Sequence, residues 1–335
     1  MNIHEKYIKR CIEIGKNGLG TTRPNPMVGS VIVHNNTIIG EGFTSPYGSN
    51  HAEVNAINAV KDKTLLKQST LYVTLEPCSH HGKTPPCSAL IVTCGIPNVV
   101  IGTLDTNSLV SGKGVDKLKA SGCNVKIGIL ENECKSHHER FFTFHNKKRP
   151  FIILKWAQTA DGFIAPKLKT EQKPVWINNE LSRQLVHKWR SEEHAILVGT
   201  NTALADNPSL TTRDWVGHNP VRIVLDRENK LDRNLNIFNS EAKTLVISEN
   251  EVNFSNPLAS QICNFLYKKD IQSVIIEGGK QTLQTFIDEN LWDEARVFIS
   301  NQVFFREGLK MPMFSGKLIS EENIINDVLK IYVND

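Results

Sequence analysis

Apolar strand-like runs alternate with helix-like segments along the whole chain, and this alternation restarts once. Strands interleaved with helices predict layered α/β domains. The first series ends in a basic stretch before Pro150, and an apolar run at residues 151–155 opens the second. With 335 residues, the chain is long enough for about two domains, each with its own core. We therefore predict one α/β domain over residues 1–145 and a second over residues 146–335.

The expected elements can be placed from these runs. Residues 1–20 show an amphipathic helical pattern, and residues 28–33 and 37–40 are expected to pair as a hairpin. The remaining elements expected in the first half are strands at 71–75, 99–102 and 124–128 and helices from 51, from about 86 and at 113–121. Strands of the second half are expected at 151–155, 195–198, 221–225, 244–247, 273–276 and 296–299.

The composition is that of an ordinary globular protein, with 40% hydrophobic and 22% charged residues. A net charge of +4, dispersed along the chain, does not favour nucleic-acid binding. No apolar run approaches the length of a membrane span. Seven irregularly spaced cysteines without a secretion signal predict reduced thiols in the cytoplasm. We expect a small-molecule partner, no nucleic acid and no membrane, and a homo-oligomer is compatible with the sequence.

Four residues of the first half have the types and order found in zinc-dependent hydrolysis of amines. His51, Cys78 and Cys87 would give three ligands to a tetrahedral zinc and leave the fourth position for water. Glu53 could carry a proton from that water to a departing amine. A His-x-Glu sequence followed by Pro-Cys is the signature of zinc deaminases. His51 and Cys87 are expected at helix starts, where the helix dipole favours thiolates.

The spacing of the two cysteines departs from that signature, which has two residues between them. Here the eight residues 79–86 separate Cys78 from Cys87. His80 is an alternative ligand, although no element is expected to fix its Gly- and Pro-containing loop. A structural zinc site, or no metal at all, is the other alternative, against which the free carboxylate of Glu53 argues. Three further histidines are expected to be solvated: His81, His137 and His138.

The second half contains three features suited to phosphate groups. Glu277-Gly278-Gly279 ends an expected strand just before a helix, so backbone amides there can approach a phosphate. The run Val198-Gly199-Thr200-Asn201-Thr202 ends another strand in small polar residues. Arg190 and Arg213 flank that run, and planar guanidinium groups suit phosphate. Each feature alone is more often structural, and the G-x-G-x-x-G dinucleotide fingerprint is absent.

With these residues in view, the chain resembles the bifunctional deaminase/reductase family of riboflavin biosynthesis from about residue 5 to residue 300. In the first half the resemblance rests on residues 24–29, His51-Ala52-Glu53 and the string from Glu76 to Cys87. The eight-residue gap in that string distinguishes the family from other zinc deaminases. In the second half it rests on Lys155-x-Ala157-x-Thr159-x-Asp161-Gly162, Trp176-Ile177, the run 198–213 and Glu277-Gly278-Gly279.

The resemblance implies a cytidine-deaminase-like three-layer α/β/α domain followed by a dihydrofolate-reductase-like α/β domain. It implies hydrolytic deamination of 2,5-diamino-6-(5-phosphoribosylamino)pyrimidin-4(3H)-one to 5-amino-6-(5-phosphoribosylamino)uracil. NADPH-dependent reduction of the ribosyl side chain to ribityl would follow. The implied cofactors are one zinc ion per chain and NADPH. By resemblance, His51, Cys78 and Cys87 bind zinc and Glu53 moves protons.

The resemblance also assigns residues to the reductase site. The proton donor in the reduction is left open between Asp206 and Lys155. The implied NADPH contacts are Ala157, Trp176, Thr202, Asp206, Gly279, Lys280, Gln281 and Thr282. The implied contacts with the phosphorylated pyrimidine substrate are Arg190, Leu210, Arg213 and Glu277.

Three positions depart from the family pattern. Residues 105–108 read Asp-Thr-Asn-Ser and lack two usual prolines, so a looser loop is expected. Pro174 replaces a serine that commonly touches substrate, and Arg227 replaces a small hydroxyl residue near the cofactor. Both activities are expected to survive. The alternative function is a zinc deaminase of another nucleotide or of an RNA base, fused to an unrelated C-terminal α/β domain. The first half lacks the basic, aromatic-lined path that RNA-acting enzymes need.

Overall fold

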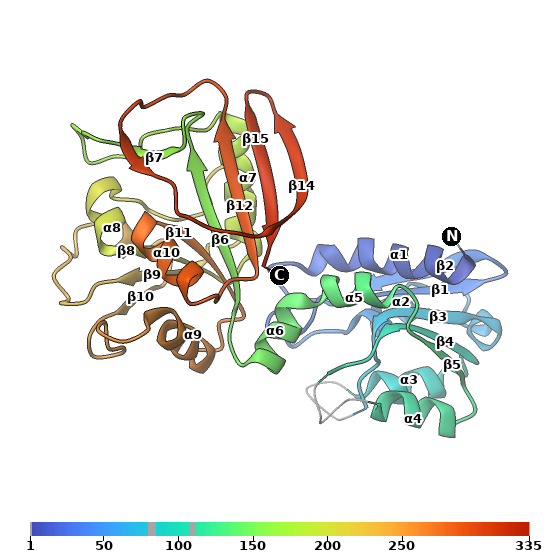
Figure 1. Ribbon diagram of the computed structural model, residues 1–335. Coiled ribbons are helices and arrows are strands. Elements are labelled where there is room, and N and C mark those ends of the chain that lie inside the picture. Colours follow the sequence, from blue (N-terminus) through green and yellow to red (C-terminus); the bar gives the residue numbers. More distant parts are fainter. Residues whose placement is uncertain (1, 80–84, 107–111, 335) are drawn as a thin grey trace. The chain divides into compact units, whose positions relative to one another are not determined.

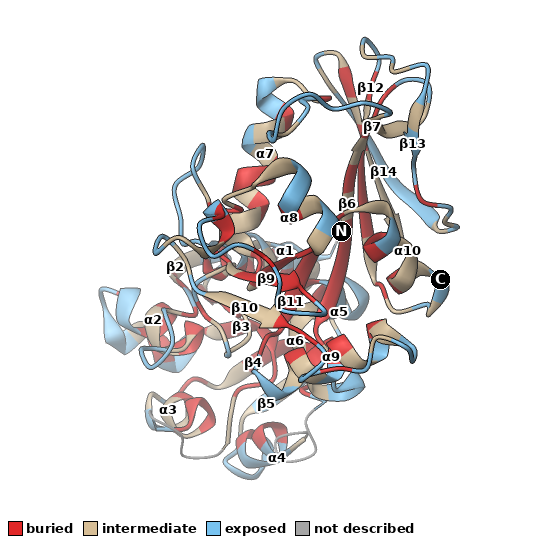
Figure 2. Ribbon diagram, turned by 90° about the vertical axis from the view of Figure 1, so that its left-hand side faces the viewer, coloured by how far each residue is buried: buried red, intermediate tan, exposed pale blue. Residues whose placement is uncertain are grey.

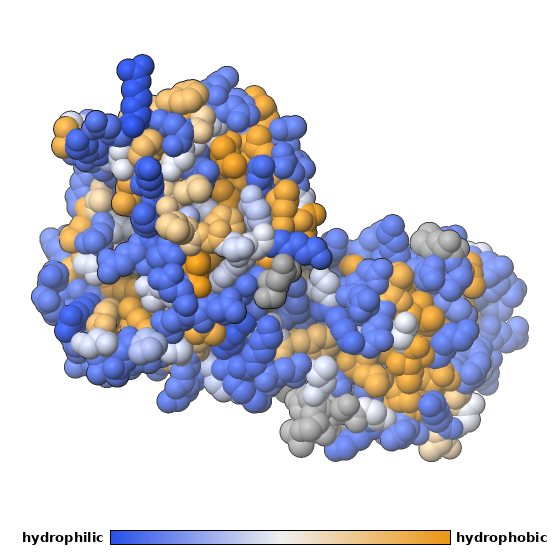
Figure 3. All heavy atoms as spheres, in the orientation of Figure 1, coloured by the Kyte–Doolittle hydropathy of each residue, from blue (hydrophilic) through white to orange (hydrophobic). Residues whose placement is uncertain are grey.

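The computed structural model describes residues 2–79, 85–106 and 112–334. The chain divides into two compact units, Met1–Lys147 and Lys148–Asp335 (Figure 1). The division falls between the last helix of the first unit and the first strand of the second. Among the described residues, no helix combines the length and apolar character needed to cross a membrane. Hydrophilic side chains cover much of the face of each unit seen in Figure 3.

The first unit is built on a five-stranded sheet with the order β2-β1-β3-β4-β5. Strands β1 and β2 form the predicted hairpin, and Asn35 and Asn36 at its turn have φ of 47° and 60°. Asparagine tolerates this left-handed backbone, which a two-residue hairpin requires. Strands β3, β4 and β5 run parallel. The elements are α1 (Ile3–Gly15), β1 (Gly29–His34), β2 (Thr37–Phe43), α2 (Ala52–Ala59), β3 (Thr70–Leu75), α3 (Cys87–Thr93), β4 (Asn98–Thr103), α4 (Lys113–Ala120), β5 (Asn124–Ile127), α5 (Glu131–His137) and α6 (Glu139–Lys147).

Helices cover both faces of this sheet. Successive side chains of a strand point to opposite faces, so Leu71 and Val73 of β3 pack with helices α2, α3 and α4. Tyr72, between them, packs with α1 and with Cys134 of α5 on the other face. The three inner strands β1, β3 and β4 are accordingly buried along most of their length (Figure 2). The predicted α/β/α layering is confirmed.

The second unit contains an eight-stranded sheet with the order β10-β9-β8-β11-β6-β12-β15-β14. The first six strands in this order, from β10 through β12, run parallel. The β14–β15 hairpin adds an antiparallel pair at the β12 edge. The elements are β6 (Phe151–Gln158), β7 (Phe163–Pro166), α7 (Glu180–Glu192), β8 (Ala195–Gly199), α8 (Thr200–Asp206), β9 (Val221–Leu225), β10 (Thr244–Ile247), α9 (Leu258–Lys268), β11 (Ser273–Gly278), α10 (Lys280–Asp288), β12 (Glu294–Ser300), β13 (Gly308–Lys310), β14 (Lys317–Ile324) and β15 (Asp327–Val333).

The core of this unit also has two layers. Ile152 and Leu154 of β6 pack against α9 and α10, whereas Phe151 and Ile153 pack against α7 and α8. All six strands expected in this half are present. The sequence did not indicate β14, because its residues are exposed nearly throughout and show no buried alternation. The predicted succession of two α/β domains is confirmed.

Two expectations about polar residues are wrong. His137 and His138 are buried, not solvated, because α5 packs against the sheet. Their Nε2 atoms lie 2.7 Å from the carbonyl oxygen of Met27 and 3.1 Å from Oγ1 of Thr74, respectively. His81 and the alternative ligand His80 lie outside the described residues, as do Asn107 and Ser108 of the expected looser loop.

Candidate active sites

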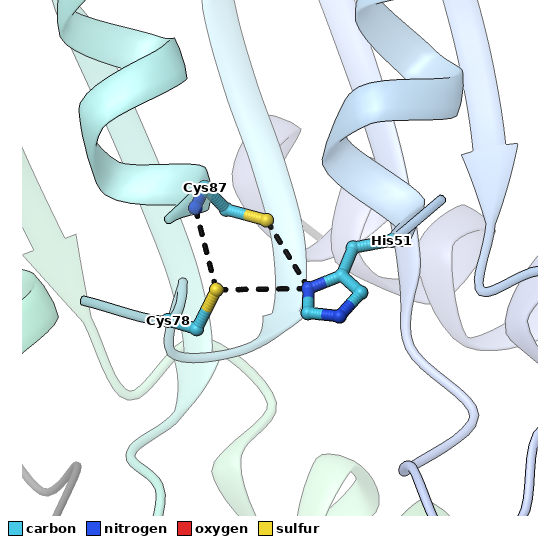
Figure 4. Close-up of side chains that lie close together, drawn as sticks. All are labelled: His51, Cys78 and Cys87. Carbon is cyan, nitrogen blue, oxygen red and sulfur yellow. Dashed lines mark hydrogen bonds between the residues drawn. The ribbon is translucent and has the colours of Figure 1, made fainter. Parts of the chain in front are cut away.

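Three predicted metal ligands meet in the first unit (Figure 4). His51 is the N-cap of α2, Cys87 is the first residue of α3, and Cys78 lies three residues after the end of β3. The Nδ1 atom of His51 lies 3.6 Å from Sγ of Cys78 and 3.3 Å from Sγ of Cys87. The three ligand atoms all lie within 4.8 Å of one another. Segments far apart in sequence thus converge because strand end and helix starts lie at one edge of the sheet.

This donor set fits zinc. One imidazole nitrogen and two sulfurs are ligands that zinc prefers, and three protein ligands leave a position for water. The backbone N–H of Cys87 donates to Sγ of Cys78 at 3.3 Å. Hydrogen bonding by the Cys87 thiol, followed by that of His51, lowers the pKa of Cys78 to about 4 despite burial. A thiolate, the form that binds metal, is therefore favoured at this position.

Glu53 lies in the first turn of α2 and is only 4% exposed. Burial is the main reason that its pKa rises to about 7, and the nearby Cys78 raises it further. The carboxyl group also interacts with Cys87. An acid that gains and loses its proton near neutral pH suits proton transfer to and from a substrate.

Glu76 is a site residue whose role the sequence did not reveal. It directly follows β3, two residues before Cys78, and its carboxylate is buried. Its oxygens accept hydrogen bonds from the backbone N–H groups of Gly112, Gly114 and Val115 at 3.0, 2.9 and 3.2 Å. The carboxylate therefore joins the turn carrying Cys78 to the start of α4. No local pattern identifies it, because its partners are backbone groups from a distant segment.

The second unit contains a cavity of about 1410 Å³. It is formed at the carboxyl ends of β6, β8, β9 and β11 and at the starts of α8 and α10. Ligands of open α/β sheets bind at this end of the strands. All the residues assigned by resemblance to NADPH or substrate line it: Ala157, Trp176, Arg190, Thr202, Asp206, Leu210, Arg213, Glu277, Gly279, Lys280, Gln281 and Thr282.

A buried ionic cluster lies in the wall of this cavity. Glu277 accepts from Nη2 of Arg190 at 2.8 Å, and Nζ of Lys155 lies 3.4 Å from its other oxygen. Burial alone would raise the pKa of Glu277, but Arg190 and then Lys155 lower it to about 2. The carboxylate is therefore ionised at neutral pH and can accept hydrogen bonds from a sugar hydroxyl.

Glycines bring the starts of α8 and α10 together beside this cluster. A Cβ atom on Gly199 would lie 2.6 Å from Oγ1 of Thr282, and one on Gly279 would lie 3.2 Å from Oγ1 of Thr202. Larger residues would therefore push the two helices apart. The start of a helix presents unpaired N–H groups to an anion, which suits the pyrophosphate of a dinucleotide.

Two residues of the cavity wall, Lys169 and Arg183, were not predicted. Lys169 pairs with Asp206, and the guanidinium of Arg183 lies 4.7 Å from the ring centre of Trp176. Both cations come from segments that carry no recognisable motif. Arg227 also lines the cavity and is bound to Glu249 at 2.6 Å, and Pro174 lines it without a polar side chain.

Comparisons with known proteins cover both units. Residues 1–103 match the cytidine and deoxycytidylate deaminase zinc-binding region, and residues 150–304 match the RibD C-terminal domain. The riboflavin biosynthesis protein RibD of Aquifex aeolicus (strain VF5) is 39% identical in an alignment that covers 95% of this chain and 92% of that protein. The match of residues 150–304 is incompatible with an unrelated C-terminal domain.

Two solved structures are similar over nearly the full length. One is a diaminohydroxyphosphoribosylaminopyrimidine deaminase/5-amino-6-(5-phosphoribosylamino)uracil reductase from Thermotoga maritima, with 40% identity, 99% coverage of both chains and a TM-score of 0.89. The other is RibD from Acinetobacter baumannii (form 1), with 30% identity, 99% coverage of both chains and a TM-score of 0.86. The chain therefore belongs to the RibD family of bifunctional deaminase and reductase proteins of riboflavin biosynthesis.

Proposed function

We propose that the first unit deaminates a phosphoribosylamino-diaminopyrimidine and that the second reduces the ribosyl group of the product. The observation that carries the first step is the convergence of His51, Cys78 and Cys87 beside the buried carboxyl group of Glu53. The second step is supported by the cavity, whose lining includes every residue assigned to cofactor and substrate.

In the deamination, His51, Cys78 and Cys87 would hold zinc, whose Lewis acidity would activate a water molecule. Glu53 accepts a proton from this water while the oxygen of the water bonds to the amine-bearing carbon of the pyrimidine. The same carboxyl group then donates the proton to the departing nitrogen, the carbon–nitrogen bond breaks and ammonia leaves. The raised pKa of Glu53 supports this two-way proton transfer.

In the reduction, the cavity would hold NADPH, which would supply a hydride to the anomeric carbon of the substrate. We assign the proton that opens the ring to Lys155, because its ammonium group carries donor protons and lies beside Glu277 in the cavity wall. Asp206 instead accepts from Lys169. Glu277 orients the sugar hydroxyls through its free oxygen lone pairs.

We assign the substrate phosphate to Arg213. Arg190 is already engaged by Glu277 and by the carbonyl oxygen of Thr211, at 2.8 and 3.2 Å. The Nη1 atom of Arg213 has a longer contact, 3.4 Å, with Oγ1 of Thr211. Its guanidinium lines the cavity and offers a fork that suits two phosphate oxygens. Leu210 would pack against the base or sugar.

The test uses the purified chain with the phosphoribosylamino-diaminopyrimidine, with and without NADPH. We expect ammonia release without NADPH, and NADPH oxidation only after ammonia has been released. Metal analysis should find about one zinc per chain, as one three-ligand site predicts. Active protein free of zinc would contradict the deaminase mechanism, and NADPH oxidation before deamination would contradict the proposed order.

We further propose that the protein works in the cytoplasm. All seven cysteines are free thiols, and two of them are proposed metal ligands. Thiols of this kind are kept reduced in the cytoplasm. When cells are lysed in acid to trap their thiols and the protein is then unfolded and labelled with a thiol reagent at neutral pH, all seven cysteines should be modified. Disulfide-linked peptides in that sample would contradict this location.

A further inference from the structure

Arg222 is a buried cation that neither reaction uses. It lies in β9, is 0% exposed and is not part of the cavity lining. A buried arginine usually has a carboxylate partner. Among the hydrogen bonds of the described residues, Arg222 has only neutral acceptors. They are the carbonyl oxygens of Ser209 (3.2 Å), Asn236 (3.2 Å), Asn239 (2.5 Å) and Ala242 (2.6 Å), Oδ1 of Asn239 (2.8 Å) and Oγ1 of Thr244 (3.0 Å).

One of these acceptors is next to a strained residue in the cavity wall. Leu210 has a φ of 54°, a left-handed backbone that costs a leucine about 1 kcal/mol or more. Arg222 donates a hydrogen bond to the carbonyl oxygen of Ser209, the residue before Leu210. Arg190 holds the carbonyl oxygen of Thr211 just after it, at 3.2 Å. Two arginine-to-carbonyl bonds therefore flank Leu210 and oppose its return to a relaxed backbone.

A second route from Arg222 reaches the same segment. Its Nη1 atom holds the carbonyl oxygen of Asn236. Asn236 in turn donates its backbone N–H to Oδ1 of Asn207 at 2.7 Å and its Nδ2 to the carbonyl oxygen of Asn207 at 3.0 Å. Asn207 ends α8 and lines the cavity. The guanidinium thus supports the segment directly at Ser209 and, through Asn236, at Asn207.

We propose that Arg222 is a positioning residue for the substrate half of the reductase site. It keeps residues 207–213 against the cavity and Leu210 in its left-handed conformation. The phosphate-binding helix starts near Gly199 and Gly279 receive no hydrogen bond from Arg222 among the described contacts. Its loss therefore weakens pyrimidine binding and leaves cofactor binding intact. The inference rests on the proposed assignment of Leu210 and Arg213 to substrate.

The main variant is Arg222→Lys, which keeps the charge but cannot span the same acceptors. We expect the reductase KM for the pyrimidine to rise about tenfold, which corresponds to the loss of one or two hydrogen bonds from a charged donor. The kcat, the Kd for NADP⁺ and ammonia release by the first unit should stay within about twofold. The matched control is Thr244→Val, which removes the bond to Nε and leaves the one to Ser209. Its KM should stay within about twofold of the wild-type value.

A second variant applies if Arg222→Lys fails to fold. Asn236→Ala alters an exposed residue and removes only the bond from Nδ2 to Asn207. We expect it to raise the same KM about threefold. An unchanged KM in Asn236→Ala, or an equal rise in KM and in the Kd for NADP⁺ in Arg222→Lys, would overturn the proposal. So would a Thr244→Val effect as large as that of Arg222→Lys. If Arg213→Ala leaves the KM unchanged, the substrate assignment itself is wrong.

Discussion

Replacing Glu277 with glutamine should destabilise the second unit without affecting the first. The side chain of Glu277 is 9% exposed, and it lies between Arg190 and Lys155, whose side chains are 11% and 14% exposed. Glutamine keeps the shape but removes the charge, so two largely buried cations lose their partner. Breaking such a buried pair costs several kcal/mol.

The size of the effect follows from the pKa of this carboxyl group. Lowering it from 4.5 to about 2 corresponds to about 3 kcal/mol of favourable interaction with the charged carboxylate. The folded-state pKa is depressed, so this stabilisation is complete above pH 4.5 and is lost as the pH falls from 4.5 towards 2. Glu277→Gln should therefore lower the free energy of unfolding by about 3 kcal/mol at pH 7. Its difference from wild type should become smaller below about pH 4.5.

Urea unfolding followed by tryptophan fluorescence measures this unit alone. All five tryptophans lie in it: Trp156, Trp176, Trp189, Trp215 and Trp292. The matched control is Glu249→Gln, which breaks an ion pair with Arg227 whose side chains are 47% and 53% exposed. That change should cost less than about 1 kcal/mol. This reasoning would be refuted if the second unit of Glu277→Gln were as stable as that of Glu249→Gln at pH 7. It would also be refuted if the stability difference from wild type did not become smaller below pH 4.5.

Three further predictions address the other sites. Glu53→Gln should retain zinc in metal analysis but lower ammonia release at least about a hundredfold, and near-normal turnover would require another proton carrier. Arg213→Ala should raise the KM for the pyrimidine about tenfold or more and leave the Kd for NADP⁺ within about twofold, whereas the reverse pattern would exchange the two subsites. Burial lowers the pKa of His137 from 6.5 to about 4, so the first unit should lose stability as the pH falls from 6.5 to 4. His137→Asn should reduce that loss in far-UV circular dichroism melts, and an unchanged pH dependence would mean that another group causes it.

The zinc site could be predicted because its ligands flank elements with clear signals. His51 and Cys87 begin helices, and Cys78 follows a continuous apolar strand, so local patterns already placed all three at element ends. The strand ends and glycines of the second unit were recognised for the same reason. Fold class followed from the alternation of strands and helices.

Other features depend on tertiary contacts that local patterns do not contain. His137 is polar in sequence but becomes buried because α5 packs against the sheet near Met27. Glu76 and Arg222 bind backbone groups from distant segments, and such partners leave no mark on residue types. The edge strand β14 was missed because neither of its faces is buried.

The order of the two reactions can be tested in a single variant, Glu53→Gln, loaded with zinc and supplied with NADPH. With the phosphoribosylamino-diaminopyrimidine, this variant should release almost no ammonia and oxidise almost no NADPH. When the deaminated phosphoribosylaminouracil is added instead, NADPH oxidation should return to the wild-type rate, because the reductase cavity is intact. NADPH oxidation on the undeaminated pyrimidine, or failure of the deaminated compound to restore it, would contradict the division of the two reactions between the two units.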